Sequence, residues 1–213
     1  MLKRDVKSIV GQPDVGGQVG LHRCVVVVVA EVGEEGLLRP DPLGFLDRLV
    51  ERGVRFVSIF TGNQTWDHHS SILKSLPAAC KQVDQPAAAL VMDLKQRGLL
   101  DTTIVHWGGE MGRLPVIQNR AGAKGRESVG RDHNTYGFSM WVAGGGFKAG
   151  HAHGATDEFG HHAVKDVVNH YDYHATVLHL LGLDTKKLSY KRNGVEQVLV
   201  ENPQARVVTG LLA

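Results

Sequence analysis

Apolar and polar positions change their spacing along the chain, and these changes predict helices and strands in turn. Three segments carry an apolar residue every three to four positions and end near a glycine, which predicts helices over 42–52, 86–97 and 172–181. Three short apolar runs predict strands over 54–60, 102–107 and 138–143. Because strands that alternate with helices form parallel sheets covered by helices, the pattern predicts an α/β domain with a mostly parallel sheet.

Residues 1–40 carry a different pattern. Turn-forming Gly and Pro residues surround the apolar run 24–30, which has the length of one buried parallel strand and is too short to span a bilayer. We therefore interpret 1–40 as an atypical N-terminal segment with a start unrelated to the rest. Residues 41–213 are expected to form the predicted domain.

Composition and charge exclude several classes of partner. The chain is 42% hydrophobic and 22% charged, with a formal net charge of only +2 and scattered basic residues, which argues against a nucleic-acid partner. Cys24 and Cys80 provide neither a disulfide framework nor metal-type spacing. The sequence contains no targeting peptide and no membrane-spanning run, which predicts a cytoplasmic protein without a membrane partner. The oligomeric state is left open.

Polar motifs follow the predicted strands, at the place where ligands of parallel sheets bind. After the first strand, Asp67 and His69 are either ligands of a divalent cation or part of a polar loop in which Asp67 caps the next segment. Glu110 follows two glycines after the second strand and is either a ligand or a solvated glutamate in a turn. Arg113 is either a bidentate partner for an oxyanion or a surface arginine.

A third motif, Gly-Arg-Asp-His-Asn at 130–134, precedes the last predicted strand. His133 could reach the same cluster, with Asp132 orienting its ring. The histidine-rich stretch 151–162 fits no metal-binding template and predicts a mobile polar loop, while the histidines within 170–179 predict a packed helix face. The chain contains no Gly-x-Ser-x-Gly motif, so metal-assisted chemistry is favoured over serine hydrolysis.

Six segments together resemble a bacterial sulfatase-like family labelled only as domain of unknown function 1501: VERGVRFV, WDHHS, DQPAAALVMDLKQRGLLDTTIVHWGGEMGRLP, GRDHNTYGFSMWVAGGGFKAG, GATDEFGHHAV and DYHATVLHLLGLD. The resemblance covers roughly residues 45–213. It implies membership of the alkaline phosphatase superfamily, whose enzymes use divalent metals to activate a Ser, Thr or formylglycine nucleophile against a phosphate or sulfate ester. It also implies an alkaline-phosphatase/sulfatase-like sheet flanked by helices.

The resemblance assigns roles to individual residues. Asp67 and His69 look like the Asp/His pair of one metal site, and Glu110 stands where the superfamily has the aspartate of an Asp-His-Gly motif. His133 resembles a later histidine ligand. The resemblance thus implies that these four residues hold Zn²⁺ or Mn²⁺, with Ca²⁺ as a further option, and that Arg113 contacts an oxyanion.

The family pattern is incomplete in two places. Met111 replaces the histidine of the Asp-His-Gly motif, and a thioether is a poor ligand for hard cations, so one of the two metal sites is altered or absent. The family's N-terminal half, which supplies the nucleophile and another metal-binding aspartate, has no counterpart in 1–40. We therefore expect 41–213 to be the C-terminal half of a sulfatase-like domain, with an incomplete sheet and no nucleophile. Full-length relatives often begin with an export signal, which implies a periplasmic or exported location for them.

The expected function is metal-dependent hydrolysis of a sulfate or phosphate ester, carried by a small molecule or a polysaccharide. The alternative is a non-catalytic remnant of the same fold that binds a metal or serves only as a structural module.

Overall fold

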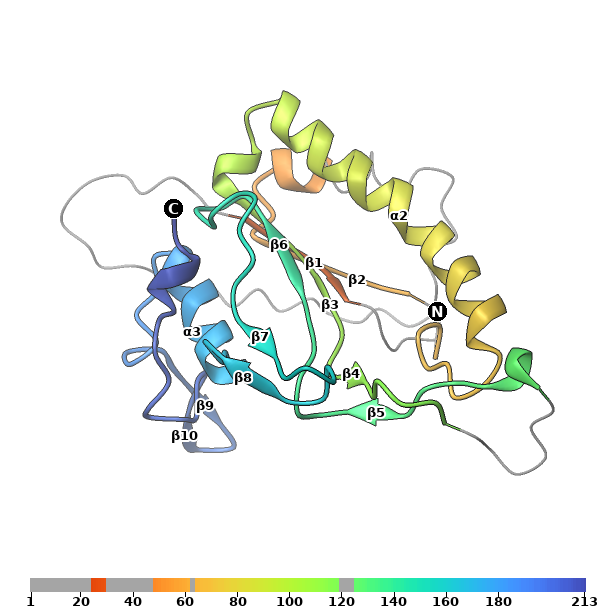
Figure 1. Cartoon of the computed structure of the whole chain (residues 1–213). Coiled ribbons are helices and arrows are strands. Elements are labelled where there is room, and N and C mark those ends of the chain that lie inside the picture. The colour runs from red at the N-terminus through yellow and green to blue at the C-terminus, as the bar shows by residue number, and fades with distance from the viewer. Residues whose placement is uncertain (1–23, 30–47, 62–63, 119–124) are drawn as a thin grey trace.

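The computed structural model describes residues 24–29, 48–61, 64–118 and 125–213 (Figure 1). A four-stranded sheet lies at its centre, with the strand order β2-β1-β3-β6. β1 (Cys24–Val29) pairs in parallel with β2 (Phe56–Phe60) on one side and with β3 (Thr103–Gly108) on the other. The valine run therefore forms a parallel strand, as its composition predicted. Apart from this strand, residues 1–40 lie outside the described part of the chain.

The predicted fold class, an alkaline-phosphatase/sulfatase-like and mostly parallel sheet flanked by helices, is wrong. The central sheet has only four short strands, and its edge strand β6 (Trp141–Ala143) runs antiparallel to β3. The remaining strands form three separate antiparallel pairs: β4 (Gly112–Arg113) with β5 (His133–Asn134), β7 (Ala155–Thr156) with β8 (Ala163–Lys165), and β9 (Ser189–Arg192) with β10 (Val195–Val198). An extended parallel sheet is absent from the part of the chain that the structure describes.

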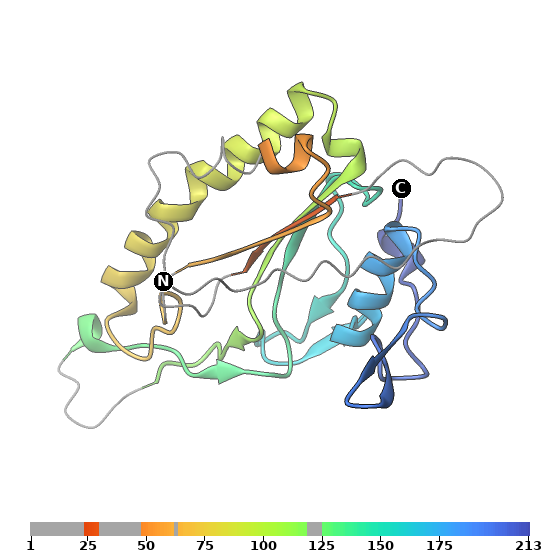
Figure 2. The same ribbon diagram turned by 180° about the vertical axis from the view of Figure 1, so that it is seen from behind.

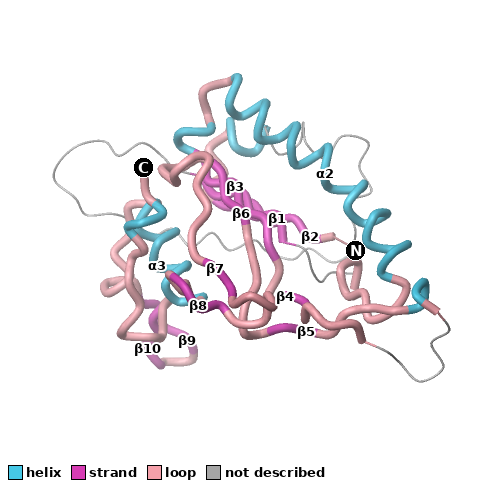
Figure 3. The backbone as a smooth tube through the Cα atoms, viewed as in Figure 1, coloured by secondary structure: helices cyan, strands magenta, loops and turns pink. Residues whose placement is uncertain are grey.

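The direction of β6 has a physical reason. A parallel neighbour for β3 requires a crossover connection, which is usually an α-helix. The described residues between β3 and β6 contain no α-helix, only β4, β5 and the short 3-10 helix η2 (Arg126–Ser128). Figure 3 shows that loops make up most of this connection. The apolar run 138–143 predicts a strand, but its period carries no information on strand direction.

Helix α2 (Ile72–Gln96) covers one face of the sheet (Figures 1 and 2). Its Leu90 and Leu94 are almost fully buried against Val57 of β2 and Val105 of β3. The helix begins at Ile72, well before the predicted start at Pro86. Both Pro77 and Pro86 lie inside it. It ends where predicted, since Gly98 adopts a φ of 67° that side chains disfavour. The described part of the helix predicted over 42–52 is helical at 48–51.

Helix α3 (His170–Leu180) lies on the opposite side of the sheet, close to the range predicted for it. Its Leu180 packs with Phe147 against Ile104 of β3. Because neighbouring strand residues point to opposite faces, Ile104 contacts α3 while the next residue, Val105, contacts α2. Two further 3-10 helices, η1 (Leu100–Thr102) and η3 (Thr209–Leu211), complete the elements of the described residues. Among the described residues, no helix is both long and apolar enough to cross a membrane.

Between β3 and α3, the Tyr173 hydroxyl lies 2.6 Å from Nδ1 of His106. Burial, with a smaller effect of the nearby His174, lowers the pKa of His106 to about 4. In the unfolded chain the pKa is near 6.5, so the unfolded state binds more protons between these two values, and stability falls as the pH is lowered through that window. We expect His106 to account for a loss of about 2 kcal/mol in unfolding free energy between pH 7 and pH 5.

The measurement is urea unfolding at both pH values in EDTA for wild type, His106→Gln and the exposed control His179→Gln. His68 and His174, whose pKa values are also lowered by burial, add to the decline, so the informative quantity is the difference between proteins. His106→Gln should show the smaller decline. Equal declines in all three proteins would contradict the assignment.

Candidate metal centre

Three potential metal ligands from two distant parts of the chain meet at one place: Asp67, His69 and His133. One ligand atom from each lies within 4.8 Å of the others. Oδ1 of Asp67 is 2.9 Å from Nε2 of His69 and 2.9 Å from Nε2 of His133. The two imidazole rings are tilted against each other with centroids 4.8 Å apart. The carboxylate is thus shared between two imidazoles, and the three donor atoms converge.

The strand pair β4–β5 positions His133. Arg113 of β4 and His133 of β5 are register partners in this antiparallel ladder, so their side chains start from neighbouring points. Nη1 of Arg113 donates a hydrogen bond of 2.5 Å to the same Oδ1 of Asp67. The Asp67 carboxylate therefore faces one guanidinium and two imidazoles.

The loop that carries Asp67 and His69 is held by the segment just before β5. The backbone N–H of Arg131 donates to the carbonyl of His68 at 2.9 Å, and that of Ile72 donates to the carbonyl of Val129 at 3.1 Å. Between these two bonds, Gly130 lies directly against the loop backbone. A Cβ at this position would overlap the carbonyl carbon and oxygen of His69. The absence of a side chain at 130 is therefore what lets the two ligand-bearing segments approach each other.

Gln118 orients the ring of His69. Its Oε1 lies 2.7 Å from Nδ1 of His69 and can accept a hydrogen bond from that nitrogen in the tautomer that carries a proton there. In that tautomer the lone pair of Nε2 points to the side of Asp67, where a cation between the two groups would accept it. Asp132, which the sequence suggested as an orienting partner for His133, instead has Oδ1 3.8 Å from Nδ1 of His69 and accepts from the backbone N–H of His133 at 2.8 Å.

The surroundings favour an ionised Asp67 carboxylate and a neutral His68 imidazole. Burial raises the pKa of Asp67, but hydrogen bonds from His133 and Arg113 and the positive charge of Arg113 outweigh it, so the pKa is lowered overall. His68 is buried, and burial followed by the charge of Arg113 lowers its pKa. A deprotonated carboxylate is the form that binds a metal.

Four of the five residues proposed from the sequence lie together: Asp67, His69, His133 and Arg113. Glu110 is exposed in a bend between β3 and β4 and does not belong to the group of converging ligand atoms. Gln118 was missed, because a glutamine in a stretch without a motif carries no sequence signal. Only its distance to His69 identifies it.

The other histidine-rich segment has a structural explanation. Asp157 accepts hydrogen bonds from the backbone N–H groups of Phe159, His161 and His162, which shapes a turn. The rings of His161 and His162 pack against Tyr136. Among the described residues, this stretch contributes no ligand to a group of three converging metal-binding atoms.

One comparison with known proteins identifies a relationship. The model of a family described as "Protein of unknown function (DUF1501)" matches residues 46–212, which include all the residues of the candidate metal centre. No curated protein and no solved structure matches the chain.

Proposed function

Because the chain belongs to the DUF1501 family, whose description names no activity, we propose its function from the chemistry of the site: binding of one divalent transition-metal ion by Asp67, His69 and His133. The observation that carries the proposal is the convergence of one carboxylate oxygen and two imidazole nitrogens within 4.8 Å. The orientation of His69 by Gln118 adds the outer partner that metal-binding histidines commonly have.

The donor set favours zinc among the expected ions. Two histidines and one carboxylate form a common ligand set of catalytic zinc sites, whereas Ca²⁺ and, less strictly, Mn²⁺ prefer more oxygen ligands. Bonds of about 2.0–2.2 Å in a tetrahedral arrangement place ligand atoms roughly 3.3–3.6 Å apart. The two contacts from Asp67 to the histidine nitrogens are 2.9 Å, so an ion requires these side chains to separate by about half an ångström.

We further propose that the bound ion serves the hydrolysis of a phosphate or sulfate ester. Three protein ligands leave a coordination position open, and a metal in such a site acts as a Lewis acid toward an ester oxygen. Arg113 favours an anionic substrate. Asp67 accepts a hydrogen bond from its Nη1, and the guanidinium has further N–H donors that can bind an oxyanion. The alternative is a site that binds the metal without catalysis.

Calorimetric titration of Zn²⁺ into metal-free protein, combined with p-nitrophenyl phosphate and sulfate assays, separates these functions. We expect one ion per chain and zinc-dependent turnover of one of the esters. Arg113→Gln should lower kcat/KM on the order of 100-fold, because a donor to developing negative charge is lost. Arg126→Gln, which removes an exposed arginine of η2, should leave it unchanged.

Stoichiometric zinc binding without turnover of either ester would reject the hydrolase and leave the metal-binding role. Absence of zinc binding would reject both.

A further inference from the structure

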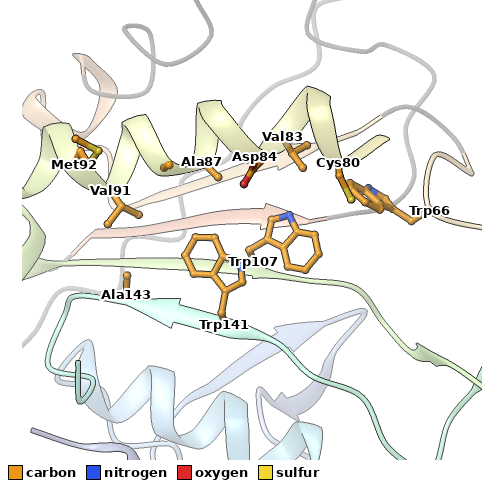
Figure 4. A pocket seen from close by; sticks show the side chains of 11 residues that line it. Trp66, Cys80, Val83, Asp84, Ala87, Val91, Met92, Trp107, Trp141 and Ala143 are labelled. Carbon is orange, nitrogen blue, oxygen red and sulfur yellow. The ribbon is translucent and has the colours of Figure 1, made fainter. Parts of the chain in front are cut away.

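A second site is hollowed between α2 and the edge of the central sheet. It is a cavity of about 640 Å³, and the three tryptophans of the chain, Trp66, Trp107 and Trp141, all line it (Figure 4). A volume of this size accommodates a small organic molecule, and ligand pockets are typically apolar with a few polar groups. Although Trp66 precedes Asp67 of the metal centre in the chain, the cavity contains none of the candidate metal ligands in its lining.

Two of the indoles lie on neighbouring strands, and all three contact one another in a row. Trp107 of β3 and Trp141 of β6 are direct register partners, with ring planes only 11° apart and centroids separated by 6.5 Å. Trp66 stands edge-to-face to Trp107 at 87°, with centroids 5.7 Å apart. Its Nε1 donates to Oγ1 of Thr61 at 3.0 Å, which satisfies the polar end of the ring. The cavity thus has a rigid aromatic wall.

One charged side chain among the described lining residues faces this wall. Asp84 of α2 lines the cavity, and Figure 4 shows its carboxylate extending from the helix toward Trp107. Among the described residues that line the cavity, none is Lys, Arg or His. None of the ion pairs found among the described residues involves Asp84. The described lining therefore carries a negative charge, and its aromatic faces add negative potential.

We propose that this cavity binds an organic cation of the alkylammonium class, with quaternary ammonium as the best fit. The indole faces attract the positive charge, and Asp84 provides a counter-ion. Apolar side chains of α2, among them Val91 and Met92, contact the alkyl groups. The Asp84 carboxylate repels an anion, and a neutral ring makes no use of the carboxylate as a counter-ion. A small inorganic cation requires a set of oxygen ligands that one carboxylate does not supply.

Intrinsic fluorescence tests the proposal directly, because every tryptophan of the chain lines the cavity. The metal-free protein in EDTA is titrated with choline chloride and, in parallel, with the neutral isostere 3,3-dimethylbutan-1-ol, both at constant ionic strength. We expect choline to bind on the order of 10-fold more tightly than the isostere, which is the difference that a partly desolvated cation–π contact supplies. Because the measurement is made without metal, its outcome is independent of the metal centre.

Two variants of α2 provide the matched comparison. Asp84→Asn should weaken choline binding about 3- to 10-fold and leave binding of the isostere unchanged. Asp93→Asn makes the same change of charge on the same helix, at a residue outside the cavity lining, and should bind choline as the wild type does.

Asp84 is exposed and Asp93 is half-buried, and Asn has nearly the shape of Asp, so both variants are expected to fold. Equal affinity for choline and its isostere, or equal weakening by both variants, would overturn the proposal.

Discussion

Asp67→Asn is expected to lower the affinity for Zn²⁺ by about 100-fold or more. Loss of an outer partner of a metal ligand typically costs 10- to 100-fold in affinity, and Asp67 is itself a ligand in the proposed site. Its Oδ1 is also the common partner of His69, His133 and Arg113. An amide oxygen carries no formal charge, so the substitution leaves the guanidinium of Arg113 uncompensated beside the ion. Competition of the protein with a chromophoric zinc chelator measures the effect.

Asp132→Asn is the matched control, because it removes the same charge from a side chain near His69. Its Oδ1 lies 3.8 Å from the His69 ring, so the change in zinc affinity should stay within about 3-fold. If both variants bind zinc equally well, Asp67 is not a ligand.

Gly130→Ala is expected to have the second large effect, on both stability and zinc binding. A methyl group at this position overlaps the backbone of His69, and backbone atoms yield less easily than the end of a side chain. Overpacking of this kind typically costs about 1–3 kcal/mol. The displaced loop carries two of the three proposed ligands, so the affinity for Zn²⁺ should fall about 10-fold or more. Urea unfolding in EDTA and chelator competition measure the two effects separately.

Gly109→Ala is the control for Gly130→Ala. An added Cβ there would lie 3.8 Å from the nearest atom, which is an ordinary contact, and the residue does not need a positive φ. Unfolding free energy and zinc affinity should both stay close to wild type. A Gly130→Ala protein that behaves like Gly109→Ala would show that the loop adjusts without cost to the site.

The local elements were more predictable than their arrangement. Glycines with positive φ follow α2 and α3 at the predicted ends, because glycine adopts this backbone conformation without the steric cost of a side chain. The start of α2 was missed, since proline is a signal for a helix start and Pro77 and Pro86 instead lie inside the helix. The direction of β6 depends on the connection that precedes it, which an apolar period does not encode.

The same limit applies to the candidate site. Motifs placed Asp67, His69 and His133 among the possible ligands, and they converge. Glu110 followed the same rule, a carboxylate just after a strand, yet it lies in an exposed bend. The rule gives the end of the sheet at which a residue lies but not the path of the loop beyond it. Gln118 acts only through its distance to His69, which no pattern in the sequence reports.

The ligands of the proposed metal lie 66 positions apart in the chain, from Asp67 to His133. An ion held by both is a cross-link that closes a long loop, much as a disulfide does, but one whose strength depends on the free metal concentration. For a site that exists only in the folded state, each tenfold rise in free ion above the dissociation constant adds about 1.4 kcal/mol to the stability. Under this proposal the stability of the domain follows the free zinc concentration around it, and scarcity of the metal lowers the stability of the fold as well as emptying the site.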